Sequence, residues 1–177
     1  GNSLEEESFD TLMDGELADM VFADDPYNLK IQDNAAGSGK IKYREFAHAS
    51  GELSSKGFID FLTRVFLYLV SFTTDGSIHY HCMDWRHVME ISLAGNAAYT
   101  ELKNICVWNK SNGGQGSFYR NKYENIYVFK SGTAKHTNNF GLGENGRYRT
   151  NVWDYPSLSA LGPNRLEQLA MHPTLKP

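Results

Sequence analysis

The sequence predicts one domain of the α/β class, in which a mostly parallel sheet is covered by helices. Three observations predict this class. The chain has 177 residues, 41% of them hydrophobic, which is enough to bury a core. Short apolar runs alternate with segments whose apolar residues recur every three or four positions. The resulting order of strand, helix, strand, helix and strand is typical of a parallel sheet with helical connections.

The same patterns place the individual elements. Helices are expected over 8–14, 58–70 and 85–93. Strands are expected over 18–23, 77–82, 102–108, 125–129 and 148–155. Asp75-Gly76 predicts a turn, and Gly95 is expected to end the last helix. Residues 29–57 are polar and contain several glycines, which predicts a long loop of the kind that forms a lid or a binding site.

Composition excludes several classes of protein. Seventeen Lys and Arg against 21 Asp and Glu give a net charge of −4, so the chain does not coat nucleic acid through bulk charge. No apolar stretch approaches the ~20 residues of a membrane span, and no signal peptide opens the chain, so a cytoplasmic location is expected. Cys82 and Cys106 lie inside apolar runs and are expected to be buried thiols in a reducing compartment.

The sharpest local feature is Asp24-Asp25-Pro26-Tyr27, which ends the first apolar strand. In open α/β sheets, ligands bind beyond the carboxyl ends of the strands, so an acidic turn at this place is positioned for chemistry. The alternative interpretation is an ordinary turn that faces solvent, because Asp and Pro are common turn residues.

Two later segments favour the first interpretation. The motif, extended by Asn28, resembles an Asp-Pro-Pro-Tyr catalytic motif. Residues 107–132 resemble a strand–loop–strand block, and residues 172–177 read His-Pro-Thr-Leu-Lys-Pro. In this order the three elements resemble the amino-group DNA methyltransferases (adenine-N6 or cytosine-N4), in the subgroup whose catalytic motif precedes the cofactor motif. Residues 82–87 and 146–153 resemble the branch that is often fused to a ParB-like domain.

The resemblance implies a Rossmann-like fold that uses S-adenosylmethionine. Residues 1–177 would then form a partial catalytic domain, with the catalytic half of the sheet and its flanking helices. Residues 29–57 would form a lid or loop on the DNA side, and residues 131–170 a small target-recognition region. Because the Asp-x-Phe-x-Gly-x-Gly cofactor motif of the family is missing, the resemblance implies that this chain alone transfers no methyl group.

The resemblance also assigns the chemistry of the motif. The lone pair of an exocyclic amino nitrogen is delocalised into the base, so the nitrogen is a poor nucleophile. The Asp24 carboxylate and the carbonyl of Asp25 would accept its two hydrogens, and Tyr27 would stack on a base flipped out of double-stranded DNA. Asp at position 24 favours adenine N6 as the acceptor, with cytosine N4 as the alternative. Asp25 stands where the family has proline, which adds a negative charge and is expected to reduce turnover.

Cofactor and DNA residues are assigned more coarsely. The resemblance implies cofactor contacts from one set of residues: Asn2, Asp24, His172, Pro173, Thr174 and Lys176. An acidic chain that handles DNA must gather its positive charge locally, which points to a second set: Lys40, Lys42, Arg44, Arg120, Arg147 and Arg149. For each of these Lys and Arg residues, the alternative is an ordinary side chain exposed to solvent at the surface.

Three further interpretations remain open in the sequence. Glu124 matches a family position, but it could equally pair with Lys122 or Arg120 at a strand edge. His79, His81 and His87 lack the ligands of a plausible metal site and are expected to be ordinary core or surface histidines. A relative without catalytic activity that only binds DNA, or that has degenerated, is the alternative to the enzyme.

Overall fold

The structure is a computed structural model that describes residues 1–30, 48–114, 118–144 and 146–156. Its helices are α1 (Glu6–Met13), α3 (Ser55–Ser71) and α4 (Val88–Ala98), with a short 3-10 helix, η1 (Trp85–His87), before α4. Its strands are β1 (Ala18–Asp24), β2 (Thr73–Met83), β3 (Glu101–Asn109), β4 (Tyr123–Lys130) and β5 (Val152–Asp154). No helix among the described residues is long and apolar enough to cross a membrane.

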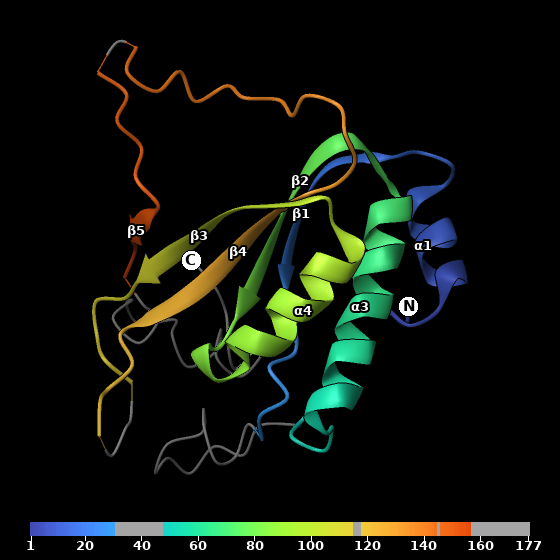
Figure 1. The fold of residues 1–177 in the computed structure, drawn as a ribbon, viewed down its shortest axis with the longest axis horizontal. Helices are drawn as coiled ribbons and strands as arrows, with labels where there is room; N and C mark the ends of the chain where they lie inside the picture. The colour runs from blue at the N-terminus through green and yellow to red at the C-terminus, as the bar shows by residue number, and fades with distance from the viewer. Residues whose placement is uncertain (31–47, 115–117, 145, 157–177) are drawn as a thin grey trace, which may run out of the picture.

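The strands form one sheet in the order β1-β2-β4-β3-β5 (Figure 1). Strand β1 is parallel to β2 and β5 is parallel to β3, whereas β4 is antiparallel to both of its neighbours. The prediction of a mostly parallel sheet is therefore confirmed, with β4 as its one antiparallel strand among the described residues. Because β4 is the next strand after β3 in the chain and pairs with it, no helical crossover separates the two, as antiparallel neighbours allow.

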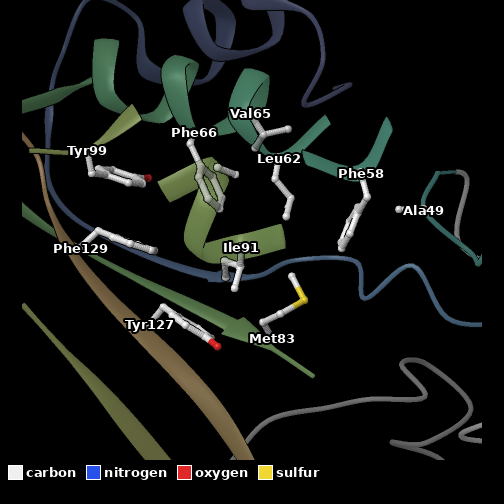
Figure 2. Packing of buried hydrophobic residues seen from close by; sticks show 11 residues of the cluster. Ala49, Phe58, Leu62, Val65, Phe66, Met83, Ile91, Tyr99, Tyr127 and Phe129 are labelled. Carbon is white, nitrogen blue, oxygen red and sulfur yellow. The ribbon is translucent and has the colours of Figure 1, made fainter. Parts of the chain in front are cut away.

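Helices α3 and α4 lie side by side on one face of the sheet (Figure 1). Helix α3 begins where the Ser54 side chain accepts a hydrogen bond from the Gly57 amide at 3.1 Å, a cap typically worth about 1 kcal/mol. Its apolar stripe is buried and meets residues of α4 and the strands in one core (Figure 2). That core includes Phe58, Leu62, Val65, Phe66, Met83, Ile91, Tyr127 and Phe129.

Side chains that alternate with this core face the other side of the sheet. Cys82, Cys106, Trp108, Ile126 and Val128 form a second buried cluster there, and both cysteines are free thiols, as expected. This face also lines a cavity of about 1350 Å³, closed in part by residues between 135 and 155.

Three element boundaries differ from the predicted ones. Strand β2 begins at Thr73, so Asp75-Gly76 is a bulge inside the strand rather than a turn before it. Helix α4 passes through Gly95 and ends at Ala98. The loop predicted over 29–57 ends before Ser55, where α3 starts, and its residues 31–47 lie outside the described part of the chain.

Candidate active site

The turn after β1 separates its two aspartates. Asp24 is the last residue of β1 and is exposed, whereas the Asp25 side chain is only 5% exposed. Adjacent residues of an extended chain point to opposite sides, and Pro26 keeps Asp25 extended. The Asp25 carboxylate therefore turns inward, where His81 Nδ1 lies 2.8 Å away. The sequence leaves open whether both carboxylates face the same side, and in the structure they do not: Asp24 is exposed and Asp25 is buried against His81.

Tyr27 connects this turn to the neighbouring strands. Its hydroxyl lies 3.1 Å from Asp24 Oδ1 and 3.0 Å from Glu124 Oε2. A phenol has one proton, so it donates to one carboxylate at a time. Burial, followed by the negative charges of Glu124 and Asp24, raises the pKa of Tyr27 well above its usual value, so the phenol stays neutral.

Glu124 completes a group at the carboxyl end of β1. Strand register places Glu124 of β4 opposite Trp108 of β3, and Lys110 just beyond forms an ion pair with Glu124. The Lys110 ammonium also lies 4.7 Å from the centre of the Trp108 ring. Lys122 and Arg120, the partners proposed from the sequence, are therefore replaced by Lys110. Asp24, Tyr27, Glu124 and Lys110 are called the edge cluster below.

Asn28 fixes the far side of the turn. Its backbone is left-handed (φ 48°), a conformation that asparagine tolerates better than most residues. Its side chain donates to the Leu53 carbonyl at 2.9 Å and accepts from the amides of Gly51 and Leu53 at 3.1 and 3.2 Å. The turn is thereby tied to the segment that leads into α3. The sequence motif includes Asn28 but predicts no role for it.

The remaining predicted residues are placed as follows. The Asn2 backbone and side chain bond to Leu4, Glu5 and Ser8 and so close the turn before α1. Seven predicted residues lie outside the described part of the chain: Lys40, Lys42, Arg44, His172, Pro173, Thr174 and Lys176. A cofactor role for Asn2 and for the last four stays a prediction.

Three of the arginines predicted to contact DNA lie in the described part of the chain, and they make separate contacts. Arg120 donates to the carbonyls of Gly113 and Gly114 at 3.0 and 2.9 Å and braces the loop between β3 and β4. The guanidinium of Arg149 lies 4.6 Å from the centre of the Phe140 ring, on the open face of the sheet. The Arg147 amide donates to the Glu144 carbonyl in a turn before β5. They belong to two segments rather than to one basic cluster.

The three histidines weighed as metal ligands from the sequence lie in and beside the core. His79 and His81 share the helix-covered side of β2 and are fully buried, and the His87 Nδ1 lies 3.6 Å from Glu90 on α4. Among the described residues no group of three or more His, Cys, Asp or Glu side chains is arranged to hold a metal ion.

Chemically, the turn offers an exposed carboxylate and, at the next residue, a backbone carbonyl. Both are hydrogen-bond acceptors at the carboxyl end of a parallel strand, where ligands of α/β sheets bind. A planar group with two N–H donors is the natural complement of two such acceptors.

Comparison with known proteins gives a consistent result. A family model described as DNA methylase, for N6 and N4 methyltransferases, matches residues 18–177. Among solved structures, TTHA0409 from Thermus thermophilus, described as a putative DNA modification methylase, superposes with a TM-score of 0.55 at 15% identity. That match covers 97% of this chain and 72% of the other. No curated protein sequence matches significantly.

Two similar structures carry a cofactor in their descriptions. An M1.HpyAVI–SAM complex has a TM-score of 0.52 at 15% identity, covering 93% of this chain and 67% of the other. TTHA0409 complexed with S-adenosyl-L-methionine has a TM-score of 0.51 at 14% identity, covering 96% and 72%. At these identities the likeness shows the fold, and it confirms the predicted Rossmann-like methyltransferase class.

Proposed function

Because the chain belongs to the DNA methylase family of N6 and N4 methyltransferases, we propose that the turn after β1 is where an amino group of a DNA base accepts a methyl group. S-adenosylmethionine supplies that methyl group as an electrophilic sulfonium. The exposed carboxylate of Asp24 supports the proposal most directly, because it suits both a cationic cofactor and an amino donor.

In the proposed mechanism, the residues of the turn activate the nitrogen. Asp24 and the carbonyl of Asp25 accept its two hydrogens, which favours a pyramidal nitrogen with its lone pair available. The Asp24 carboxylate would stabilise the positive charge that develops on the nitrogen as it takes up the methyl group. The nitrogen would then give up one of its two protons through Asp24 to water at the exposed turn, so that the base keeps a neutral methylamino group.

Adenine N6 is the proposed acceptor, because the family resemblance associates Asp at position 24 with adenine, and cytosine N4 is the alternative. Tyr27 is proposed to stack on the flipped base, since its phenol is neutral and its ring is only half-buried. Digestion of methylated DNA to nucleosides distinguishes the two products by mass.

DNA contacts are proposed for six basic residues and two segments. The segments are the lid over 29–57 and the target-recognition region over 131–170. The residues are Lys40, Lys42, Arg44, Arg120, Arg147 and Arg149, which would neutralise phosphates around the site.

Transfer of a labelled methyl group to duplex DNA tests the function. The product of the complete reading frame is assayed beside residues 1–177 alone, which we expect to be inactive. Asp24→Asn should lower kcat by roughly 10²–10³ in the active form, the usual effect of removing one stabilising group. The matched control is Asp19→Asn, an exposed position on the same strand whose Oδ1 accepts from Thr74. DNA binding without any transfer by the complete product would instead support the non-catalytic relative.

A further inference from the structure

Behind the turn lies a chain of buried polar side chains, which we call the buried polar chain. It begins at Asp25, whose carboxylate is 2.8 Å from His81 Nδ1. His81 Nε2 and His79 Nδ1 each lie 2.9 Å from the Tyr99 hydroxyl. At the inner end, His79 Nε2 is within 3.0 Å of Ser77 and 3.1 Å of Thr73. All six side chains belong to buried residues.

The core holds this chain firmly in place. His81 and His79 come from β2, and Tyr99 follows α4. The Tyr99 ring stacks on that of Phe129 (Figure 2), with centres 4.9 Å apart and an angle of 8°. The centre of the Phe66 ring lies 4.2 Å from that of His81. A polar group in such surroundings is costly unless it is hydrogen-bonded, so each link constrains the next.

With Asp25 as a carboxylate, two proton arrangements satisfy the buried polar chain. If His81 carries two protons, its Nε2–H donates to Tyr99, and the Tyr99 hydroxyl donates to His79 Nδ1. If His81 carries one, Tyr99 donates to His81 and accepts from His79, which in turn accepts from Ser77. Burial, and then the charge of His81, lower the pKa of His79 to about 4, so His79 is neutral in both. In both, His81 Nδ1–H donates to Asp25.

We propose that Asp25 is a positioning residue: its carboxylate, held by His81, anchors the turn to the core so that Asp24 faces outward and Tyr27 reaches Glu124. The proposal rests on the proposed function of the turn for its catalytic meaning. Two anchors then hold the turn from opposite sides, Asp25 to β2 and Asn28 to the segment before α3. A side chain that departs from the family pattern thereby acquires a specific role.

The test uses tyrosine NMR of the 177-residue chain. The Tyr27 ring signal is assigned with Tyr27→Phe and reports the geometry of the turn. Asp25→Ala should move that signal, and should weaken binding of a duplex with adenine opposite an abasic site at least tenfold. Asp25→Asn should leave the Tyr27 signal near its wild-type position, because the amide oxygen still accepts from His81 Nδ1–H.

The matched control is Ser77→Ala, which removes a partner of His79 at the inner end of the buried polar chain. It should lower the unfolding midpoint without moving the Tyr27 signal. If Asp25→Ala, like Ser77→Ala, changes only the midpoint, Asp25 is merely structural and the proposal is overturned.

A second measurement needs no variant. Nitrogen NMR of the wild-type imidazoles must show a proton on His81 Nδ1, and an unprotonated Nδ1 would overturn the proposal even if Asp25→Ala fails to fold. Failure of the proposed function is recognised separately. If the product of the complete reading frame neither binds DNA nor transfers a methyl group while the Tyr27 pattern of the 177-residue chain holds, the anchor stands and the enzymatic role falls.

Discussion

At the residue scale, sequence could identify Asp24, Asp25 and Tyr27 as a group but not the directions in which they point. The identity of adjacent acidic residues carries no information about which one is buried; strand alternation and the position of His81 decide it. Lys110 and Glu124 lie 14 positions apart and meet only because β3 and β4 pair antiparallel. The motif in the sequence therefore identifies Asp24 and Tyr27 of the edge cluster, whereas the contact between Lys110 and Glu124 could not be predicted from it.

Two buried tyrosines give opposite predictions for the loss of a hydroxyl group. The Tyr99 hydroxyl bridges His79 and His81, so Tyr99→Phe leaves two buried imidazole nitrogens without their partner and should destabilise the fold by about 2–4 kcal/mol. The Tyr127 side chain lies in the same core (Figure 2). Its hydroxyl is buried and has no hydrogen-bond partner among the described residues. Tyr127→Phe should therefore be neutral or stabilise by up to about 1 kcal/mol.

Urea unfolding followed by tryptophan fluorescence measures both free energies of unfolding. Each variant serves as the control for the other, because both remove one phenolic oxygen from the same core. A loss of more than about 1 kcal/mol in Tyr127→Phe would show that its hydroxyl has a partner.

At the element scale, the strongly periodic segments were predicted well and their ends were not. The stripe of α3 and the apolar runs of β1, β3 and β4 depend on local pattern, which sequence displays directly. The bulge at Asp75-Gly76 depends on a distant segment, because Asp75 Oδ1 accepts from the amides of Thr133 and Ala134 at 2.7 and 3.0 Å. The local sequence pattern does not indicate that contact, so it predicts a turn at Asp75-Gly76.

Gly95 shows the same limit within α4 and yields a prediction. A glycine near the end of a helical pattern suggests a stop, but here the Phe129 ring packs against the helix backbone. A Cβ at position 95 would lie 2.2 Å from the nearest ring atom of Phe129. Gly95→Ala should therefore destabilise by roughly 1–3 kcal/mol, although alanine normally favours a helix by up to about 1 kcal/mol over glycine.

Gly57→Ala in α3 is the control for this substitution. Its Cβ would meet the Ser54 hydroxyl at 3.3 Å, a contact that a small rotation relieves, so the expected change is within about 1 kcal/mol. Thermal unfolding compares the two variants. If the two variants unfold at the same midpoint temperature, Phe129 moves away from position 95 at no cost in free energy. The close approach of Phe129 to Gly95 would then not contribute to stability.

At the scale of the whole molecule, a net charge of −4 must be reconciled with DNA as substrate. Each basic residue that neutralises a phosphate contributes about 0.9 to the slope of log K against log salt concentration. Arg147→Gln and Arg149→Gln should each lower that slope by about 1 and weaken binding similarly for all sequences. Lys56→Gln is the control, since Lys56 pairs with Asp60 on the exposed side of α3. If the slope of log K against log salt concentration is unchanged in both arginine variants, residues 147–149 do not belong to the DNA interface.

Stability should also depend on pH through His79. Its folded pKa is about 4, below the 6.5 of an unfolded histidine, so the unfolded chain binds the extra proton first as pH falls. The stability that the fold gains while His79 is neutral is complete above pH 6.5 and is lost progressively as the pH falls towards 4. At 1.36 kcal/mol per pKa unit, and with allowance for relaxation of the site on protonation, about 2–3 kcal/mol of stability should disappear over this interval. The polar groups that face His79 are His81, Ser77 and Thr73 from β2, and Tyr99 after α4.

Urea unfolding of the wild type and of His79→Gln at pH 7, 5.5 and 4 isolates this contribution. The variant should be less stable at pH 7 but should lose less stability on acidification, because glutamine does not titrate. Exposed carboxylates whose pKa is lowered, such as Asp75 beside the Ala134 amide, contribute stability that acidification removes from both proteins. This loss cancels in the difference between the wild type and His79→Gln. Parallel curves for the two proteins would mean that His79 is protonated without penalty in the fold, which its burial between β2 and Tyr99 argues against.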